Sequence, residues 1–163
     1  MEDYVKHSMR ELGRSMLRAY KNSWIPRKRD MDAFIEAIVT QRAWFSLDPV
    51  EGGPPKIPQQ ELAMRIKQNN TRYQALITKI DRMERILAGM TDEELDIIEY
   101  YHWSGMPWHE AILRLPPVSK STFFRRLGEI EQAVGCKWID EVAKLGIDSH
   151  AKSCYNNNIG VRI

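Results

Sequence analysis

The sequence has few cysteines, no long apolar run and little net charge, and each shortage removes a class of protein. Two cysteines in 163 residues are too few for a disulfide scaffold, and their spacing is not that of a metal site. No apolar run approaches the ~20 residues that span a bilayer, and the N-terminal stretch has no apolar segment of signal-peptide type. We therefore expect a cytoplasmic protein that spans no membrane and uses no metal or cofactor.

The composition that remains is that of an ordinary globular protein. Hydrophobic residues make up 43% of the chain and charged residues 28%, and 24 Lys and Arg against 22 Asp and Glu leave a net charge of +2. A net charge this small favours neither nucleic acid nor any other charged partner, so only the placement of the charges along the chain is informative. Apolar residues recur at three- and four-residue steps along most of the chain, which predicts an all-α fold.

Residues 1–58 are predicted to form an N-terminal helical region that ends in a linker rich in proline and glycine. Apolar spacing predicts helices over 3–22 and about 30–46, and Pro26 is expected to end the first of them. The linker follows over 48–58. Residues 1–29 contain eight cations and three carboxylates, and this excess of five positive charges predicts non-specific binding to phosphates.

Residues 59–89 are predicted to form one long helix with a coiled-coil-like repeat. Its apolar positions fall seven apart in two rows, which is the spacing of a helical seam: Ile66, Tyr73, Ile80 and Leu87, with Leu62, Asn69, Leu76 and Met83. The seam either packs on the N-terminal helices of the same chain or joins two copies into a homodimer. A polar Asn69 in the row slightly favours self-association, because a buried asparagine can fix register.

Residues 90–146 are predicted to form a domain of short helices, followed by a flexible tail over 147–163. Thr91 and Glu94 have the spacing of a capping box, which opens the first helix. Gly105 is expected to break that helix, and Pro107 to begin the next. Ser119 is an expected N-cap of the third helix, and Gly135 its expected C-cap.

The second and third of these helices have the pattern of a helix-turn-helix DNA reader. Phe123, Leu127 and Ile130 give the third helix a buried row, while its other sides carry short polar groups and cations. The segment 111–128 contains four cations and no carboxylate, whereas 92–99 contains five carboxylates and no cation. Seven residues are the candidate DNA-binding residues: Ser119, Lys120, Ser121, Thr122, Phe124, Arg125 and Arg126.

These residues also carry a resemblance to a known family. The matching pieces are the acidic opening 92–95, the bulky run 98–103, Gly105 before 108–110, and 119–122 followed by aromatics and two arginines. They resemble region 4 of sigma-70-type factors in small phage regulators. With the preceding long helix, the chain is similar to the ArpU/RinA-like phage late-gene transcriptional regulators over roughly 60–136. The turn 115–119 departs from the family, because it is one residue longer and has no glycine.

The resemblance implies a sequence-specific transcriptional activator that binds double-stranded DNA as a homodimer and acts with bacterial RNA polymerase. It also implies a phage- or prophage-encoded protein in a bacterial cytoplasm. The acidic helix over 92–99 is then one candidate contact for polymerase, although carboxylates at a helix start are favourable in themselves. Two alternatives stay open: a phage small terminase subunit, and a protein-interaction adaptor that binds no DNA.

Enzyme chemistry has little support in the sequence. There is no phosphate-binding glycine loop and no nucleophile elbow. His102 and His109 are the closest pair of histidines, but neither cysteine has the spacing of a third ligand. We interpret one histidine as packed and the other as exposed, Trp103, Trp108 and Tyr101 as core residues, and the protein as a non-enzyme with no catalytic residues.

Overall fold

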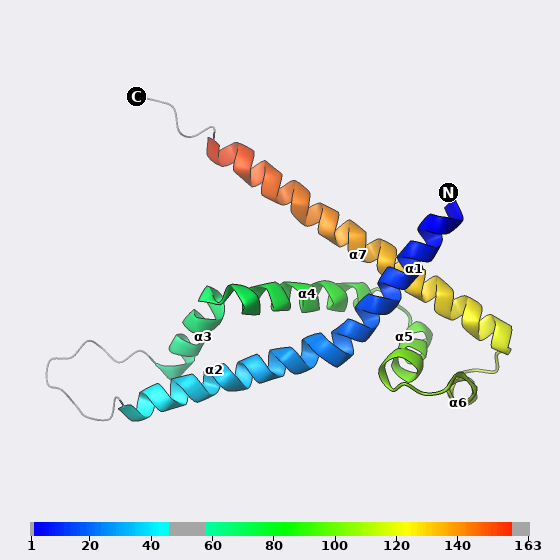
Figure 1. Ribbon diagram of the computed structural model, residues 1–163, viewed down its shortest axis with the longest axis horizontal. Helices are drawn as coiled ribbons and strands as arrows, with labels where there is room; N and C mark the ends of the chain where they lie inside the picture. Colours follow the sequence, from blue (N-terminus) through cyan, green and yellow to red (C-terminus); the bar gives the residue numbers. More distant parts are fainter. Residues whose placement is uncertain (1, 46–57, 158–163) are drawn as a thin grey trace, which may run out of the picture. The chain divides into compact units, whose positions relative to one another are not determined.

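A computed structural model describes the backbone over residues 2–45 and 58–157, and the side chains over 2–41 and 58–144 (Figure 1). These residues form helices and connecting turns with no strand, so the predicted all-α fold class is confirmed. The chain divides into two compact units, one made of Tyr20–Asp81 and the other of Met1–Ala19 with Arg82–Ile163. The first helix therefore belongs with the C-terminal part of the chain, whereas the sequence grouped it with residues 20–58.

The unit Tyr20–Asp81 is a packed set of helices around a small apolar core. It contains the π-helical turn η1 (Tyr20–Trp24), α2 (Ile25–Phe45), α3 (Gln59–Asn69) and the first part of α4 (Thr71–Ala88). Ile35 and Val39 of α2 are buried with Tyr73 of α4, and apolar residues of α3 complete the cluster. Leu62, Ile66 and Tyr73 belong to the seven-residue repeat, so these positions pack within their own chain.

Pro26 does not end the N-terminal helix as predicted. The backbone is helical on both sides of it, and the five-residue π-helical turn η1 lies directly before Ile25. A proline in a regular helix clashes with the carbonyl four residues earlier and leaves it without a donor. The π-helical turn changes that register just before the ring, so the chain absorbs the proline without leaving the helix.

The prediction of one long helix over 59–89 is wrong, because the helix is interrupted at Asn70. This residue has an extended conformation (φ −88°, ψ 100°) between α3 and α4. Its side-chain oxygen accepts a hydrogen bond of 3.0 Å from the backbone N–H of Tyr73, as an N-cap of α4 does. Asn69 is exposed and is therefore not a buried seam residue of the described chain.

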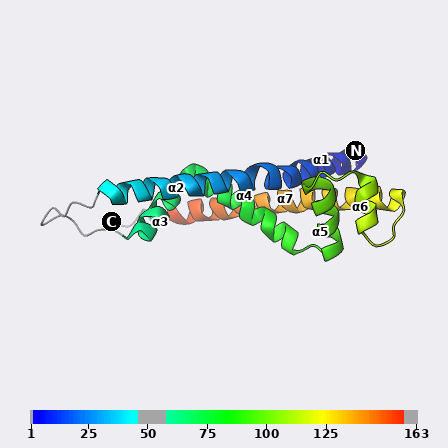
Figure 2. The ribbon, with the colours of Figure 1, turned by 90° about the horizontal axis from the view of Figure 1, so that it is seen from below.

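The second unit is built on a close crossing of α1 (Glu2–Ala19) and α7 (Lys120–Asn157). Both ribbon views place these two helices side by side (Figures 1 and 2). Gly13 and Gly135 lie at the crossing, where a Cβ on Gly13 would overlap the backbone carbonyl of Glu131 and one on Gly135 that of Met9. Only glycine allows backbones to approach this closely.

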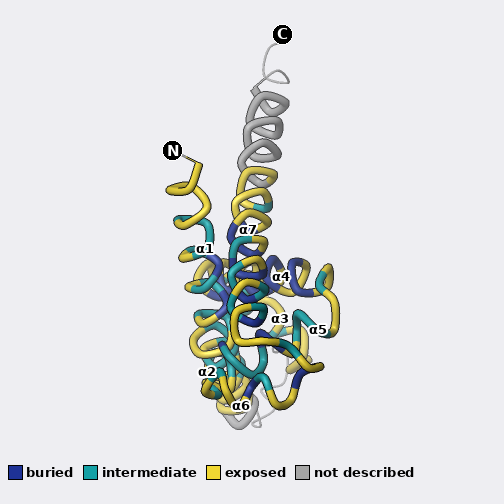
Figure 3. The backbone as a smooth tube through the Cα atoms, turned by 90° about the vertical axis from the view of Figure 1, so that its right-hand side faces the viewer, coloured by how far each residue is buried: buried dark blue, intermediate teal, exposed yellow. Residues whose placement is uncertain are grey.

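Gly135 is therefore not the C-cap that the sequence predicts. It lies inside α7, which continues without interruption through 137–145 to Asn157. The sequence predicts a flexible tail over 147–163, with no helical pattern from Ser149 onward. Its backbone is helical to Asn157, and residues 158–163 lie outside the described residues. Figure 3 shows the buried crossing giving way to exposed residues further along α7.

The short elements between α4 and α7 agree more closely with the local sequence signals. They are α5 (Asp92–Ile98), the π-helical turn η2 (Glu99–Trp103) and α6 (Trp108–Arg114). The capping box of Thr91 and Glu94 is confirmed. The helix ends before Gly105 as predicted, and this glycine has a φ of +64°. Pro107 precedes α6 as expected.

The predicted linker 48–58 lies outside the described residues apart from Pro58. No helix in the described part of the chain is long and apolar enough to cross a bilayer.

Candidate nucleic-acid interface

The predicted reader consists of α6, a non-helical turn over 115–119 and the first turns of α7. Phe123, Leu127 and Ile130 are all buried, which confirms the apolar row that orients α7. Ser119 caps the helix, because its Oγ accepts a hydrogen bond of 3.2 Å from the backbone N–H of Thr122. In α6 the most buried residue is Ala111, with Trp108 and Ile112 only half-buried.

A layer of aromatic rings holds α6 and η2 against the start of α7. Tyr101 packs edge-to-face against Phe123 and Phe124, with ring centroids 5.9 and 6.4 Å apart. Trp108 lies 6.1 Å from Phe124. Phe124 therefore contributes to this layer and is half-buried, so its role is mainly in packing. Trp103 also packs inward, since its indole N–H donates to the backbone carbonyl of Leu17 at 3.0 Å.

The three candidate cations have different surroundings. Arg126 pairs with Glu93 of α5 and so links two helices of the unit. Arg125 pairs with Glu129 one turn along α7 at 2.8 Å, and its side chain remains 65% exposed. Lys120, the first residue of α7, is exposed, and its ammonium lies 4.5 Å from the centroid of the Trp108 ring. Lys120 and Arg125 thus face solvent, whereas Arg126 has a structural partner.

The hydroxyl groups at the start of α7 bond mainly to one another. Ser119 Oγ lies 2.9 Å from both Ser121 Oγ and Thr122 Oγ1. Ser119 is occupied as the cap, and Thr122 is half-buried. Ser121 is exposed, so it is the hydroxyl best able to exchange its present partner for a ligand.

Two residues that bear on this surface were missed by the sequence analysis as site residues. Arg114, at the end of α6, is exposed and lies 5.8 Å from the ring of Tyr100. It is one of the four cations of the segment 111–128. Glu129 lies just beyond the basic segment 111–128 and reduces the positive charge by pairing with Arg125. The i, i+4 spacing of Arg125 and Glu129 was the signal that could have found this pair.

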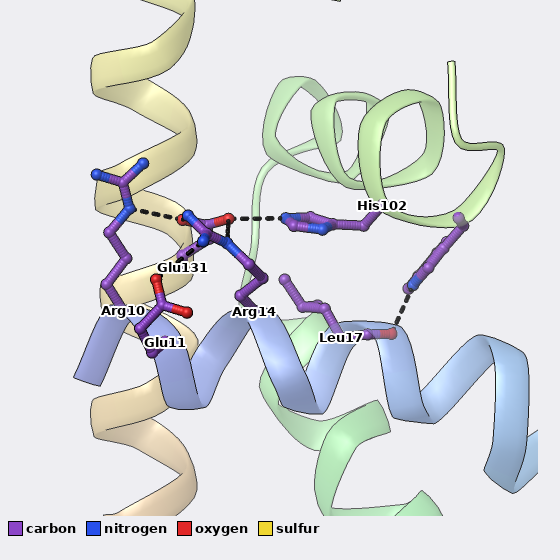
Figure 4. Close-up of polar contacts among 7 residues, drawn as sticks. Arg10, Glu11, Arg14, Leu17, His102 and Glu131 are labelled. Atoms are coloured by element: carbon purple, nitrogen blue, oxygen red, sulfur yellow. Dashed lines mark hydrogen bonds and ion pairs between the residues drawn. The ribbon is translucent and has the colours of Figure 1, made fainter. Parts of the chain in front are cut away.

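Behind the reader, a fully buried carboxylate joins α7 to α1 and η2 (Figure 4). Glu131 accepts hydrogen bonds from Arg10 Nε at 2.7 Å and from Arg14 Nε and Nη2 at 2.9 and 3.1 Å. The Nε2 of buried His102 lies 3.2 Å from Glu131 Oε1, without the geometry of a regular hydrogen bond. We call Arg10, Arg14, His102 and Glu131 the Glu131 cluster.

Opposing effects act on the acidity of the Glu131 side chain. Burial alone would raise the pKa of this carboxyl, but the contacts with His102, Arg14 and Arg10 outweigh burial and lower the pKa to about 2. The same pairing raises the pKa of Arg14. Glu131 is therefore charged at neutral pH, and its charge is compensated by Arg10 and Arg14 of α1.

Neither histidine belongs to a metal site in the described part of the chain. His102 is buried and His109 is exposed, which confirms the interpretation of one packed and one surface residue. No group of three or more His, Cys, Asp or Glu among the described side chains has the arrangement of a metal site. Cys136 is exposed, and the side chain of Cys154 lies outside the described residues.

Comparison with known proteins gives no relative of this chain: no family model, no curated protein and no solved structure matches it.

Proposed function

We propose that this protein is a sequence-specific DNA-binding transcriptional regulator that uses the α6–α7 segment as its reader. The observation that carries the proposal is the division of the first turns of α7 into two sides. Phe123 and Leu127 are buried against the unit, while Ser121 and Arg125 face solvent. A DNA-reading helix needs this division, because the buried row fixes its angle and the exposed side meets base edges and phosphates.

The ion pair of Arg125 is compatible with this role. Both partners are exposed and lie one helical turn apart, and such pairs contribute on the order of 0.5 kcal/mol. A phosphate or a guanine edge can replace Glu129 at little cost, since a guanidinium makes strong paired hydrogen bonds to either. Lys120, Ser121 and Arg125 are therefore the proposed contacts, and Arg126 supports them by fixing α7 to α5.

The wider role follows from the sequence resemblance. We propose a phage late-gene activator that binds promoter DNA as a homodimer and acts with bacterial RNA polymerase. We place the dimer contact elsewhere than at Leu62, Ile66 and Tyr73, because these positions of the seven-residue repeat pack within their own chain. The exposed acidic side of α5, with Asp92 and Asp96, is the proposed polymerase contact.

Selection of bound fragments from randomised duplex DNA tests the proposal, followed by titration of the enriched sequence by fluorescence anisotropy. We expect Arg125→Ala to weaken binding by about 1–3 kcal/mol, which is roughly 5- to 150-fold, if Arg125 reads a base. Lys144→Ala is the matched control, because Lys144 is an exposed α7 cation that also pairs with a glutamate. It should bind like the unaltered protein.

Other results would contradict the proposal. Failure to enrich any sequence, or unchanged affinity for both Lys120→Ala and Arg125→Ala, would remove α7 as the reader. Binding to a protein with no affinity for duplex DNA at moderate salt would favour the adaptor alternative. A ring of many subunits in light scattering would favour a small terminase subunit.

A further inference from the structure

Arg10 of α1 lies against the solvent-facing side of the proposed reading helix. Its guanidinium packs on Gly128, where a Cβ would lie 3.0 Å from Arg10 Cζ and 3.1 Å from Nη1. Ser121, Arg125 and Gly128 follow one another at i, i+4 and i+7 and so share one face of α7. The guanidinium of Arg10 therefore lies on the same face as Ser121 and Arg125, one turn further along α7. It reaches this face from α1, a segment 121 residues from Glu131 in sequence.

The two arginines of the Glu131 cluster differ in how many guanidinium nitrogens remain without a hydrogen bond among the described residues. Arg14 uses Nε and Nη2 on Glu131 and Nη1 on Glu11, so all three of its nitrogens are engaged. Arg10 donates only through Nε, and within the described residues its two terminal nitrogens make no hydrogen bond. In Figure 4 these nitrogens point away from Glu131, and the side chain is 37% exposed.

We propose that Arg10 is a DNA-backbone contact, held in place by Glu131 and by the absence of a side chain at Gly128. This inference rests on the proposed reader. From the Ser119 cap to Gly128 the helix rises about 14 Å, which exceeds the ~8.5 Å depth of the major groove. When the first turns of α7 enter the groove, Gly128 and Arg10 reach the edge where phosphates lie. A guanidinium with two terminal nitrogens available suits a phosphate oxygen pair.

The number of phosphate contacts can be measured from the dependence of DNA affinity on salt. Each neutralised phosphate contributes about −0.9 to the slope of log K against log salt concentration. We expect Arg10→Gln to reduce the magnitude of this slope by about 0.9 on the enriched duplex, over about 50–200 mM salt. Glutamine can still donate to Glu131, and Arg14 still pairs with it, so the fold should be preserved.

A second variant moves Arg10 without changing any charge. In Gly128→Ala the added Cβ meets only the flexible end of Arg10, so the guanidinium must give way by a few tenths of an ångström while the helix is retained. We expect a partial loss of slope, smaller than that of Arg10→Gln, with an unchanged circular dichroism spectrum. The control Lys144→Gln removes an equal charge far along α7 and should keep the original slope.

The outcomes separate this inference from the proposed function. If the unaltered protein binds no duplex, the reader itself is wrong. If it binds DNA and both Arg10→Gln and Gly128→Ala are folded and keep its slope, Arg10 does not contact the backbone. A reduced slope in Gly128→Ala with an intact fold supports the contact even if Arg10→Gln fails to fold.

Discussion

Each compact unit of this protein contains a carboxylate that receives three donors, Glu131 in one and Asp32 in the other, and these two sites differ in burial and in the kind of cation. In the unit Tyr20–Asp81, Asp32 of α2 binds Lys28 Nζ at 2.9 Å, Lys67 Nζ at 2.7 Å and the hydroxyl of Tyr73 at 2.8 Å. We call these four residues the Asp32 cluster. Its carboxylate is 20% exposed, whereas Glu131 is fully buried.

In these two clusters the kind of cation matches the depth of the acid. A buried carboxylate needs most of its lone pairs satisfied, and the planar guanidinium of Arg14 satisfies two at once. A partly exposed one can also be hydrated, so the single-point ammonium groups of Lys28 and Lys67 suffice. Burial raises the pKa of Asp32, but hydrogen bonds from Lys67, Lys28 and Tyr73 outweigh it and lower the pKa to about 2.

The largest expected effect is that of Glu131→Gln. It leaves two arginines facing a neutral side chain at the α1–α7 crossing, and breaking a buried pair costs about 3 kcal/mol or more of unfolding free energy. A urea titration followed by methyl NMR signals should show early loss at Ile130 and Val134. Signals of Ile35 and Val39, in the other unit, serve as the internal control. Unchanged midpoints in both units would mean that Glu131 contributes nothing to the crossing.

A smaller effect is expected for the equivalent change in the other cluster, Asp32→Asn. Asparagine can still accept from Tyr73, and Lys28 and Lys67 are exposed enough to be hydrated, so we expect a loss of about 1–2 kcal/mol. The same NMR titration should now show the early loss at Ile35 and Val39. A loss as large as that of Glu131→Gln would show that burial does not control the strength of these clusters.

The smallest expected effect is the difference between the units in acid. Both carboxyls have a folded pKa of about 2, against ordinary values of 4.5 for Glu131 and 3.8 for Asp32. Their stabilisation is therefore complete at neutral pH and is lost as pH falls from about 4.5 towards 2. Because Glu131 is fully buried whereas Asp32 is 20% exposed, we expect the larger loss of stability in the unit of Glu131.

An acid titration followed by the same methyl signals measures this difference. At matched urea concentration, Ile130 and Val134 should lose more stability than Ile35 and Val39 between neutral pH and pH ~2. Equal losses in the two units, or greater loss at Ile35 and Val39, would contradict the comparison.

The features predictable from sequence are those fixed by neighbours along the chain. The capping box at Thr91, the cap at Ser119 and the buried row of Phe123, Leu127 and Ile130 depend on spacings of three to seven residues. Their chemistry is complete within one or two turns of helix, so a single sequence carries the whole signal.

The features that were not predictable depend on contacts between distant segments. Gly135 looks like a C-cap locally, but its role depends on Gly13 and Met9 at the crossing with α1. Arg10 was only one of many N-terminal cations, because nothing in its own segment links it to Glu131. The break at Asn70 was missed for a different reason. The seven-residue repeat continues across Asn70, so the apolar pattern gives no sign that this asparagine caps a new helix.

The glycine crossing has a consequence for recognising relatives of this chain. Because the two backbones touch at Gly13 and Gly135, and the adjoining acid must be matched by basic groups, these positions cannot vary independently. The chain therefore carries a two-part fingerprint, Arg10-x-x-Gly13-Arg14 with Gly128-x-x-Glu131-x-x-x-Gly135. Divergent homologues that have lost overall similarity should be detectable as sequences that keep both halves together.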